Sequence, residues 1–392
     1  MAKVIVHIDL NAFFVRAEEL KNPALENKPV AIGHNGRAGV VSTCSYKARE
    51  YGVRSAMPMA TAVKLCPELI IIPGDYRFYI AKSYDFKQFI KGYTPLVEEA
   101  SIDEVFADFT EQVKNIKDVE GYFKDLQNAL LQATGLKCSI GIGPTKFLAK
   151  MGSDYRKPMG ITIIRKRDIK EMLFPLHISD MFGVGKRSAP RLEKLGVKTI
   201  GDLYERIISN DEDVSNILGK GKSTLLEWLE GQGSDEIITQ FDEAKSIGNS
   251  TTLKEDTSRY EMIKEYFDYL AKEVSIRAKK EDLYGTTIQI MVKDTSFNAH
   301  NKSLTLENPT NEYKDILNVA LKLYESNFLD LTIRAVGVTL QNLVSKQDMV
   351  VQMTFFDYEM HENDSKTKLL INEMNRKLKG SKLTRASEVK KK

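Results

Sequence analysis

The pattern of apolar residues changes twice along this chain, and the change limits the folds open to it. Over residues 1–165, short β-branched apolar segments alternate with amphipathic stretches, whereas residues 166–235 carry helical patterns punctuated by glycines. From 245 to 344, strand-like runs, the clearest at 286–292 and 332–340, alternate with helical patterns again. Each pattern must bury its own apolar residues, so we predict an α+β protein of several domains. The 392 residues suffice for two or three domains of about 150 residues each.

The first 165 residues contain the segments on which the functional argument depends. We predict strands at 4–10, 30–32, 39–43, 69–72, 101–109 and 138–142. We predict helices at 11–22, 59–65, 76–92, 122–134 and 144–151. Beyond the last β-rich segment, a polar tail contains one further helical pattern, at 367–378.

Charge and cysteine content narrow the class of protein. The net charge is only +3, so an acidic partner must be argued from where the charges lie. Cys44, Cys66 and Cys138 are far apart, which is typical of buried reduced thiols in a cytoplasmic protein. No apolar run approaches the roughly 20 residues of a membrane span, and the N-terminal run stops at Asp9 without a signal-peptide cleavage site. We therefore expect a cytoplasmic protein with no membrane partner.

Three carboxylates lie at strand ends. Asp9 closes the first predicted strand, and Asp103 and Glu104 stand together at the start of another. Adjacent strand residues point to opposite faces, so both members of the pair can face one ion only at a strand end. Three carboxylates with a backbone carbonyl would form a hard oxygen site suited to Mg²⁺. The alternative for each residue alone is a cap or a solvated turn.

Next to Asp9 the chain turns into the helix that contains Phe13 and Phe14. A helix N-terminus presents free N–H groups and positive potential to a phosphate. Tyr46 and Arg49 are three residues apart on another helix face and could clamp a phosphate. The alternatives are core packing for Phe13 and Phe14 and a surface aromatic–cation pair for Tyr46 and Arg49.

A Gly-x-Gly turn at Gly183 and Gly185 is followed by Lys186 and several further cations. The pattern predicts a helix, a tight turn that lets a phosphate approach the backbone, and a second helix. This local basic cluster indicates a helix-hairpin-helix that grips the DNA backbone without reading sequence. A helical turn used only for packing is the alternative. Residues 218–222 resemble a weaker second copy.

These parts occur in the order found in one family. The chain resembles the Y-family translesion DNA polymerases, most closely the bacterial DNA polymerase IV type, over roughly residues 3–344. The resemblance is carried by His7-Ile8-Asp9-Leu10-Asn11-Ala12-Phe13-Phe14, by residues 41–49 and 52–58, by Ser101-Ile102-Asp103-Glu104, and by residues 141–146 and 157–160.

The resemblance implies a right-hand architecture. It consists of a ferredoxin-like palm (1–10 and 75–165), small fingers (11–74), a helix-hairpin-helix thumb (166–235), a linker (236–244), an α/β little-finger domain (245–344) and a tail (345–392). The implied activity is template-directed DNA synthesis on damaged DNA from dNTP, with low fidelity and no proofreading. The implied partner is primer-template DNA, and we expect a monomer.

The resemblance also assigns site residues. Asp9, Asp103 and Glu104 would be catalytic and would hold two Mg²⁺ ions with the Leu10 carbonyl. The nucleotide-binding residues would be Phe13, Phe14, Thr43, Tyr46, Arg49 and Lys157. The ring of Phe14 would be the steric gate that excludes a 2′-hydroxyl, and Gly183, Gly185 and Lys186 would contact DNA. Many relatives carry an acid where this chain has Asn11, a difference that leaves the three ligands intact.

A peptide in the tail resembles the bacterial motif that binds the sliding clamp. Its residues are Gln352, Met353, Phe355 and Phe356, which would bury apolar anchors in a groove of the clamp's β subunit. A stray apolar patch is the alternative.

Two other functions compete with the polymerase. A non-catalytic DNA-binding adaptor on the same scaffold would not need the three carboxylates or Tyr46, Arg49 and Lys157. A nucleotide cyclase with a palm fold would leave the Gly183–Gly185 hairpin and the last domain unexplained. Primer extension by the purified protein distinguishes these cases.

Overall fold

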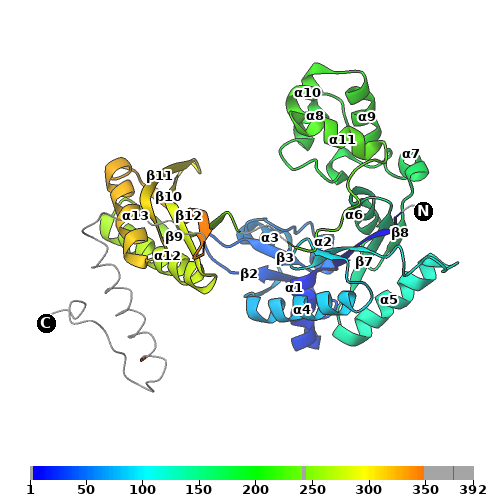
Figure 1. Cartoon of the computed structure of the whole chain (residues 1–392), viewed down its shortest axis with the longest axis horizontal. Coiled ribbons are helices and arrows are strands. Elements are labelled where there is room, and N and C mark those ends of the chain that lie inside the picture. Colours follow the sequence, from blue (N-terminus) through cyan, green and yellow to red (C-terminus); the bar gives the residue numbers. More distant parts are fainter. Residues whose placement is uncertain (1–2, 241–243, 348–373, 375–392) are drawn as a thin grey trace. The chain divides into compact units, whose positions relative to one another are not determined.

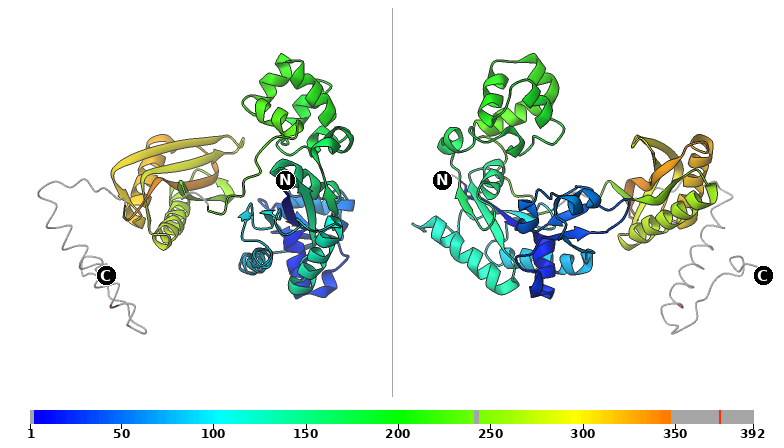
Figure 2. Two further views of the ribbon diagram at one scale, coloured as in Figure 1. Left: turned by 45° about the vertical axis from the view of Figure 1, so that its right-hand side comes forward. Right: turned by 180° about the vertical axis from the view of Figure 1, so that it is seen from behind.

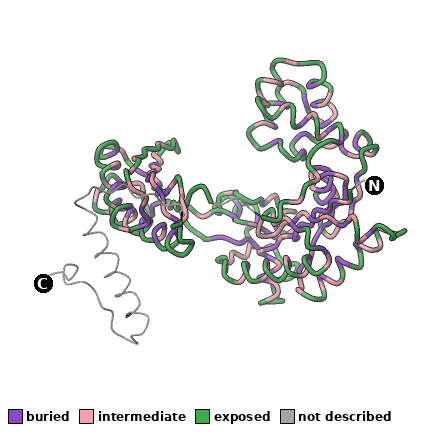
Figure 3. Tube along the Cα trace, in the orientation of Figure 1, coloured by how far each residue is buried: buried purple, intermediate pink, exposed green. Residues whose placement is uncertain are grey.

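The computed structural model describes residues 3–240, 244–347 and 374. The chain forms two compact units, Met1–Asp242 and Glu243–Lys392, drawn in Figure 1. Buried residues concentrate in the sheets of each unit and in the helices packed against them (Figure 3). None of the helices in the described residues is long and apolar enough to cross a membrane. The three cysteines are buried and form no disulfide.

The first unit is built on a five-stranded sheet of order β5-β6-β1-β7-β8. Its strands are β5 (Val97–Glu99), β6 (Glu104–Asp108), β1 (Ile5–Leu10), β7 (Cys138–Gly143) and β8 (Ile161–Ile163). The central strand β1 pairs antiparallel with both β6 and β7. Its six residues are all buried, because both faces of the sheet are covered by helices.

The helices on the two faces receive alternate side chains of β1. Val6, Ile8 and Leu10 belong to a core that includes Phe86 and Phe123, which lie in α4 (Tyr76–Lys91) and α5 (Val119–Thr134). On the opposite face His7 bonds to Ser153 in α6 (Lys146–Tyr155), and Asp9 meets Lys150 of the same helix. The period of two in the strand therefore separates an apolar face from the face that carries the first carboxylate.

A smaller sheet of order β3-β2-β4 follows β1 in the chain. It contains β2 (Val30–Gly33), β3 (Val41–Cys44) and β4 (Ile70–Ile72), with the helices α1 (Phe13–Lys21), α2 (Tyr46–Glu50) and α3 (Met59–Leu65), and η1 (Pro23–Leu25). Helix α2 begins where Ser45 accepts a hydrogen bond from the Ala48 amide, a side-chain cap that fixes Tyr46 and Arg49 on the first turn.

The region 166–235 is helical, as its glycine-punctuated pattern predicts. It contains η2 (Lys166–Asp168), α7 (Ile169–Met172), η3 (Ile178–Asp180), α8 (Ala189–Lys194), α9 (Ile200–Ile208), α10 (Glu212–Leu218) and α11 (Gly221–Leu229). Their buried residues form one core together with Phe147, Leu148 and Met151 of α6.

The second unit contains a four-stranded antiparallel sheet of order β11-β10-β12-β9. Its strands are β9 (Ser246–Thr257), β10 (Leu283–Asp294), β11 (Ala299–Thr310) and β12 (Ile333–Ser345). Helices α12 (Tyr260–Lys280) and α13 (Tyr313–Asn327) pack on the sheet, as the views in Figure 2 show. Alternate residues of the two central strands join both helices in one core.

Several predicted boundaries are wrong for local reasons. The first helix begins at Phe13 rather than Asn11, because Ala12 is left-handed at φ 46° and Asn11 uses its side chain elsewhere. The strand predicted over 101–109 is only Glu104–Asp108, since residues 101–103 form a turn. The helix predicted before Gly183 is a three-residue 3₁₀ turn, Ile178–Asp180. The sequence analysis predicts no strand at the positions of the two short edge strands, β5 and β8. The helix expected at 367–378 lies outside the described residues, apart from Met374.

Candidate active site

Strand pairing brings two of the three predicted carboxylates together. Asp9 on β1 and Glu104 on β6 are direct partners in the antiparallel register, so their side chains share a face of the sheet. The two carboxyl groups lie close enough for each to shift the pKa of the other. As the first residue of β6, Glu104 stands at a strand end, where the sequence argument requires it to be.

Asp103 lies at the same edge but is turned differently. Its backbone carbonyl accepts a hydrogen bond from the Leu10 amide at 3.0 Å, which ties the turn to the end of β1. Its carboxylate accepts a bond of 2.8 Å from the Ser101 hydroxyl, and it lines the same cavity as Asp9. In the part of the chain that the structure describes, no three His, Cys, Asp or Glu side chains are grouped so as to hold a metal ion. The three carboxylates are therefore close neighbours that do not converge on one point.

Two lysines balance these acids. Lys150 of α6 places its Nζ 2.6 Å from a Glu104 oxygen and 3.3 Å from Asp9 Oδ2. Lys157 Nζ lies 2.8 Å from Asp9 Oδ1 and 2.7 Å from Asp154 Oδ1. The sequence analysis predicts Lys157 and misses Lys150, whose position in a buried helix suggests only core packing. Its four-residue spacing from Lys146, which places both cations on one helix face, is the one local signal for it.

Burial and these charges shift the pKa values in opposite directions. Burial raises the pKa of Asp9 to about 7, and its interaction with Glu104 acts the same way. Burial opposes ionisation of Glu104 too, but its neighbours His7, Asp9 and Lys150 together hold its pKa below the usual range. Asp9 therefore binds its proton more strongly than an ordinary carboxyl group does, whereas Glu104 is ionised. A nearby divalent cation would change this charge state.

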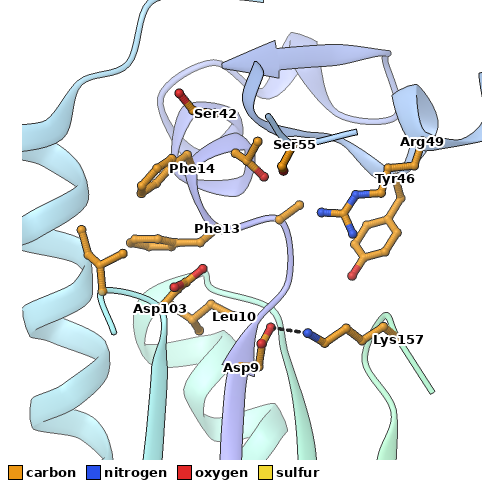
Figure 4. Close-up of a pocket in the computed structure, with 13 residues that line it drawn as sticks. Asp9, Leu10, Phe13, Phe14, Ser42, Tyr46, Arg49, Ser55, Asp103 and Lys157 are labelled. Atoms are coloured by element: carbon orange, nitrogen blue, oxygen red, sulfur yellow. Dashed lines mark ion pairs between the residues drawn. The ribbon is translucent and has the colours of Figure 1, made fainter. Parts of the chain in front are cut away.

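A cavity of about 350 Å³ opens beside Asp9. Every residue that we predict to bind nucleotide lines it, together with Asp9, Leu10 and Asp103. Arg49 lies over the Tyr46 ring, 4.5 Å from its centroid, so the two side chains share one face of α2. Figure 4 shows Tyr46, Arg49 and Lys157 on one side of the cavity and Asp103, Phe13 and Phe14 across from them. Ala12, Ser42, Ser55 and Ile102 also line it; they lie in the motifs that carry the family resemblance, but the sequence analysis assigns them no role.

The two phenylalanines differ in their environment. Phe13 is 2% exposed and belongs to the apolar core, whereas Phe14 is half-buried. The Phe14 ring stacks on Tyr79, with centroids 4.4 Å apart and planes at 12°. The Tyr79 hydroxyl donates a bond of 2.7 Å to the buried carboxylate of Glu18, and burial, reinforced by this bond, raises the pKa of Tyr79. Phe14 therefore has a rigid support at the cavity wall.

The basic hairpin is separate from this cavity. Gly183 has φ +94°, and the site of an added Cβ on Gly185 is open space, so the backbone is accessible to a close approach. Lys186 and its basic neighbours are exposed and form no ion pair with any residue that the structure describes; they are Arg187, Arg191, Lys194 and Lys198. The weaker copy joins two α-helices, because α10 ends at Leu218 and α11 begins at Gly221, whereas only the 3₁₀ turn Ile178–Asp180 precedes Gly183. The predicted clamp-binding residues Gln352, Met353, Phe355 and Phe356 lie outside the described residues.

Comparison with known proteins identifies the family. Residues 8–154 match the impB/mucB/samB family and residues 244–355 match its C-terminal domain. The chain is 36% identical to DNA polymerase IV of Bacillus velezensis, covering 100% of this chain and 94% of that protein. The chain belongs to the Y-family DNA polymerases, of the DNA polymerase IV type. DNA polymerase IV 1 of Bacillus subtilis is also 36% identical, with the same coverage.

Solved structures of Y-family polymerases agree in fold. A Y-family DNA polymerase chimera matches with a TM-score of 0.76, and DinB from Sulfolobus solfataricus with 0.58. Both are 25% identical and cover 88% of this chain and 100% of theirs. An insertion ternary complex of Dbh DNA polymerase matches with a TM-score of 0.60. The chain is thus a DNA-directed DNA polymerase of the translesion family, with the α+β multidomain fold that its sequence predicts.

Proposed function

We propose that the cavity beside Asp9 binds an incoming dNTP and that this polymerase extends a primer there across damaged template DNA. In this assignment the five-stranded sheet is the palm, the three-stranded sheet the fingers, the helical region the thumb and the second unit the little finger. The observation that supports the proposal most directly is that one cavity is lined by Asp9, Asp103, Tyr46, Arg49 and Lys157.

The donor chemistry at the palm edge fits divalent magnesium. Asp9, Asp103 and Glu104, with the Leu10 carbonyl, are hard oxygen ligands of the kind that Mg²⁺ prefers. The raised pKa of Asp9 and the two lysines drawn to the acid pair indicate a site that needs positive charge. Two bound ions would lower the pKa of the primer 3′-hydroxyl and neutralise charge on the triphosphate.

The chain's own side chains supply binding and exclusion. Tyr46, Arg49 and Lys157 are placed to hold the triphosphate by charge-assisted hydrogen bonds. The ring of Phe14, supported by Tyr79, is placed to lie beneath the sugar and leave no room for a 2′-hydroxyl. The exposed cations beside Gly183 and Gly185 bind the DNA backbone irrespective of sequence. The peptide 352–356 recruits the enzyme to the sliding clamp.

Primer extension tests the catalytic assignment. Asp103→Ala and Glu104→Ala should each abolish extension while DNA binding, measured by fluorescence anisotropy, is retained. Glu111→Ala is the matched control, because Glu111 is an exposed acid paired with Lys114 and does not line the cavity. Extension at the wild-type rate by either palm variant would refute the assigned site, and the adaptor hypothesis predicts no extension by the wild-type protein.

A further inference from the structure

The turn that carries Lys157 is held by two buried amides that no sequence motif connects. Asn11 Oδ1 accepts a hydrogen bond of 2.8 Å from the Met159 amide. Gln127 Nε2 donates bonds of 3.1 Å to the Met159 carbonyl and 2.9 Å to the Cys138 carbonyl. Both polar groups of one backbone residue are thus fixed by side chains from the β1–α1 turn and from α5.

The three polar side chains at the centre of this network are buried and fully bonded. Asn11 is 4% exposed, Gln127 1% and Ser139 0%. The Asn11 amide donates to the Ser139 hydroxyl at 2.9 Å, and Gln127 Oε1 accepts from Lys124 at 2.9 Å. Since every amide group has a partner, each side chain has one favoured orientation.

Met159 needs this support. Its φ is +61°, a left-handed conformation that costs free energy for a residue with a side chain. Pro158 and Met159 line a second cavity of about 350 Å³, which they share with Asn11, so one side of the turn is open. Lys157, at the start of the turn, lines the first cavity. The turn therefore lies between two open spaces. The bonds from Asn11 and Gln127 hold its Met159 residue, and a bond of 2.9 Å from the Ile140 amide to the Gly160 carbonyl holds its end.

We propose that Asn11 and Gln127 are positioning residues that set where the Lys157 ammonium group meets the triphosphate. This inference rests on the proposed function, in which Lys157 contacts the incoming nucleotide. Small displacements of a binding group reduce rates and affinities strongly. Loss of either amide lets the Met159 turn move, and Lys157 moves with it.

Steady-state kinetics of single-nucleotide insertion test the inference. Gln127→Met keeps the length of the side chain and removes both donors, and Asn11→Ala removes the Met159 acceptor. We expect each to raise the KM for dNTP by about tenfold with a much smaller change in kcat. In a Lys157→Ala background the same substitutions should change KM less than about twofold, because residues that act through one group are not additive.

The control is Thr94→Val. Thr94 is 2% exposed and bonds to the Asp108 carbonyl at 2.9 Å in the same palm, yet it lines neither cavity. It should lower the melting temperature and leave KM unchanged. The positioning role is overturned if Lys157→Ala raises KM while Asn11→Ala and Gln127→Met do not. It is also overturned if Asn11→Ala and Gln127→Met raise KM as much in the Lys157→Ala background as they do in the wild type. An unchanged KM in Lys157→Ala instead refutes the triphosphate contact itself.

Discussion

Replacing Asp9 by Asn should stabilise the metal-free polymerase at neutral and higher pH while abolishing catalysis. The Asp9 carboxyl is 7% exposed, and its burial raises its pKa from the ordinary 3.8 to about 7. The two nearby ammonium groups keep partners in the variant. Lys157 retains Asp154, and Lys150 retains Glu104. Asn fills the same space without an ionisable proton, so the ionisation cost disappears.

The sign and size of the effect follow from linkage. The folded protein holds the Asp9 proton more strongly than the unfolded chain does. The stability that protonated Asp9 contributes to the folded wild type is therefore fully present below pH ~4 and is lost as the pH rises through about 7. Three pKa units correspond to about 4 kcal/mol in full, of which about 2.5 kcal/mol falls between pH 5 and pH 8. The free energy of unfolding of Asp9→Asn, relative to that of wild type, should therefore rise by this second amount between pH 5 and pH 8.

Urea unfolding in EDTA at pH 5, 6, 7 and 8 measures the effect. Trp228 is the only tryptophan, lies in the first unit and stacks between Phe147 and Phe182, so its fluorescence reports unfolding of that unit. Asp75→Asn is the control. A hydrogen bond from Lys21 lowers the pKa of Asp75, so this carboxylate stays ionised from pH 5 to pH 8, and the stability difference between Asp75→Asn and wild type should not change with pH over this range. A stability difference between wild type and Asp9→Asn that does not change with pH would refute the reasoning.

Three further outcomes are expected. Phe14→Ala should admit ribonucleotides, measured as the ratio of kcat/KM for dNTP and rNTP; unchanged sugar discrimination would remove Phe14 from its role. Lys186→Glu together with Arg191→Glu should weaken binding to DNA of any sequence and lower the salt slope by about 1 for each phosphate that the variant no longer neutralises, whereas an effect confined to some sequences would contradict backbone binding. Deletion of residues 352–356 should leave intrinsic extension intact and remove stimulation by the clamp, and equal stimulation of the truncated enzyme would exclude this peptide.

Local patterns predicted much of the fold. The apolar run that ends at Asp9 is β1, and the three-residue spacing of Tyr46 and Arg49 places them together on α2. The glycines at 183 and 185 lie in a turn before α8. These features depend on periodicity, capping and backbone freedom, which act over a few neighbouring residues and can therefore be recognised in one sequence.

Long-range packing decided the rest of the site. The pairing of Asp9 with Glu104 depends on the register between β1 and β6, and the approach of Lys150 depends on where α6 crosses the sheet. The bonds from Asn11 and Gln127 to Met159 join residues 148 and 32 positions apart. No local pattern encodes such contacts, because they form only when separate elements pack. The sequence alone thus determined which chemical groups this polymerase carries, and the tertiary structure decided which of them meet.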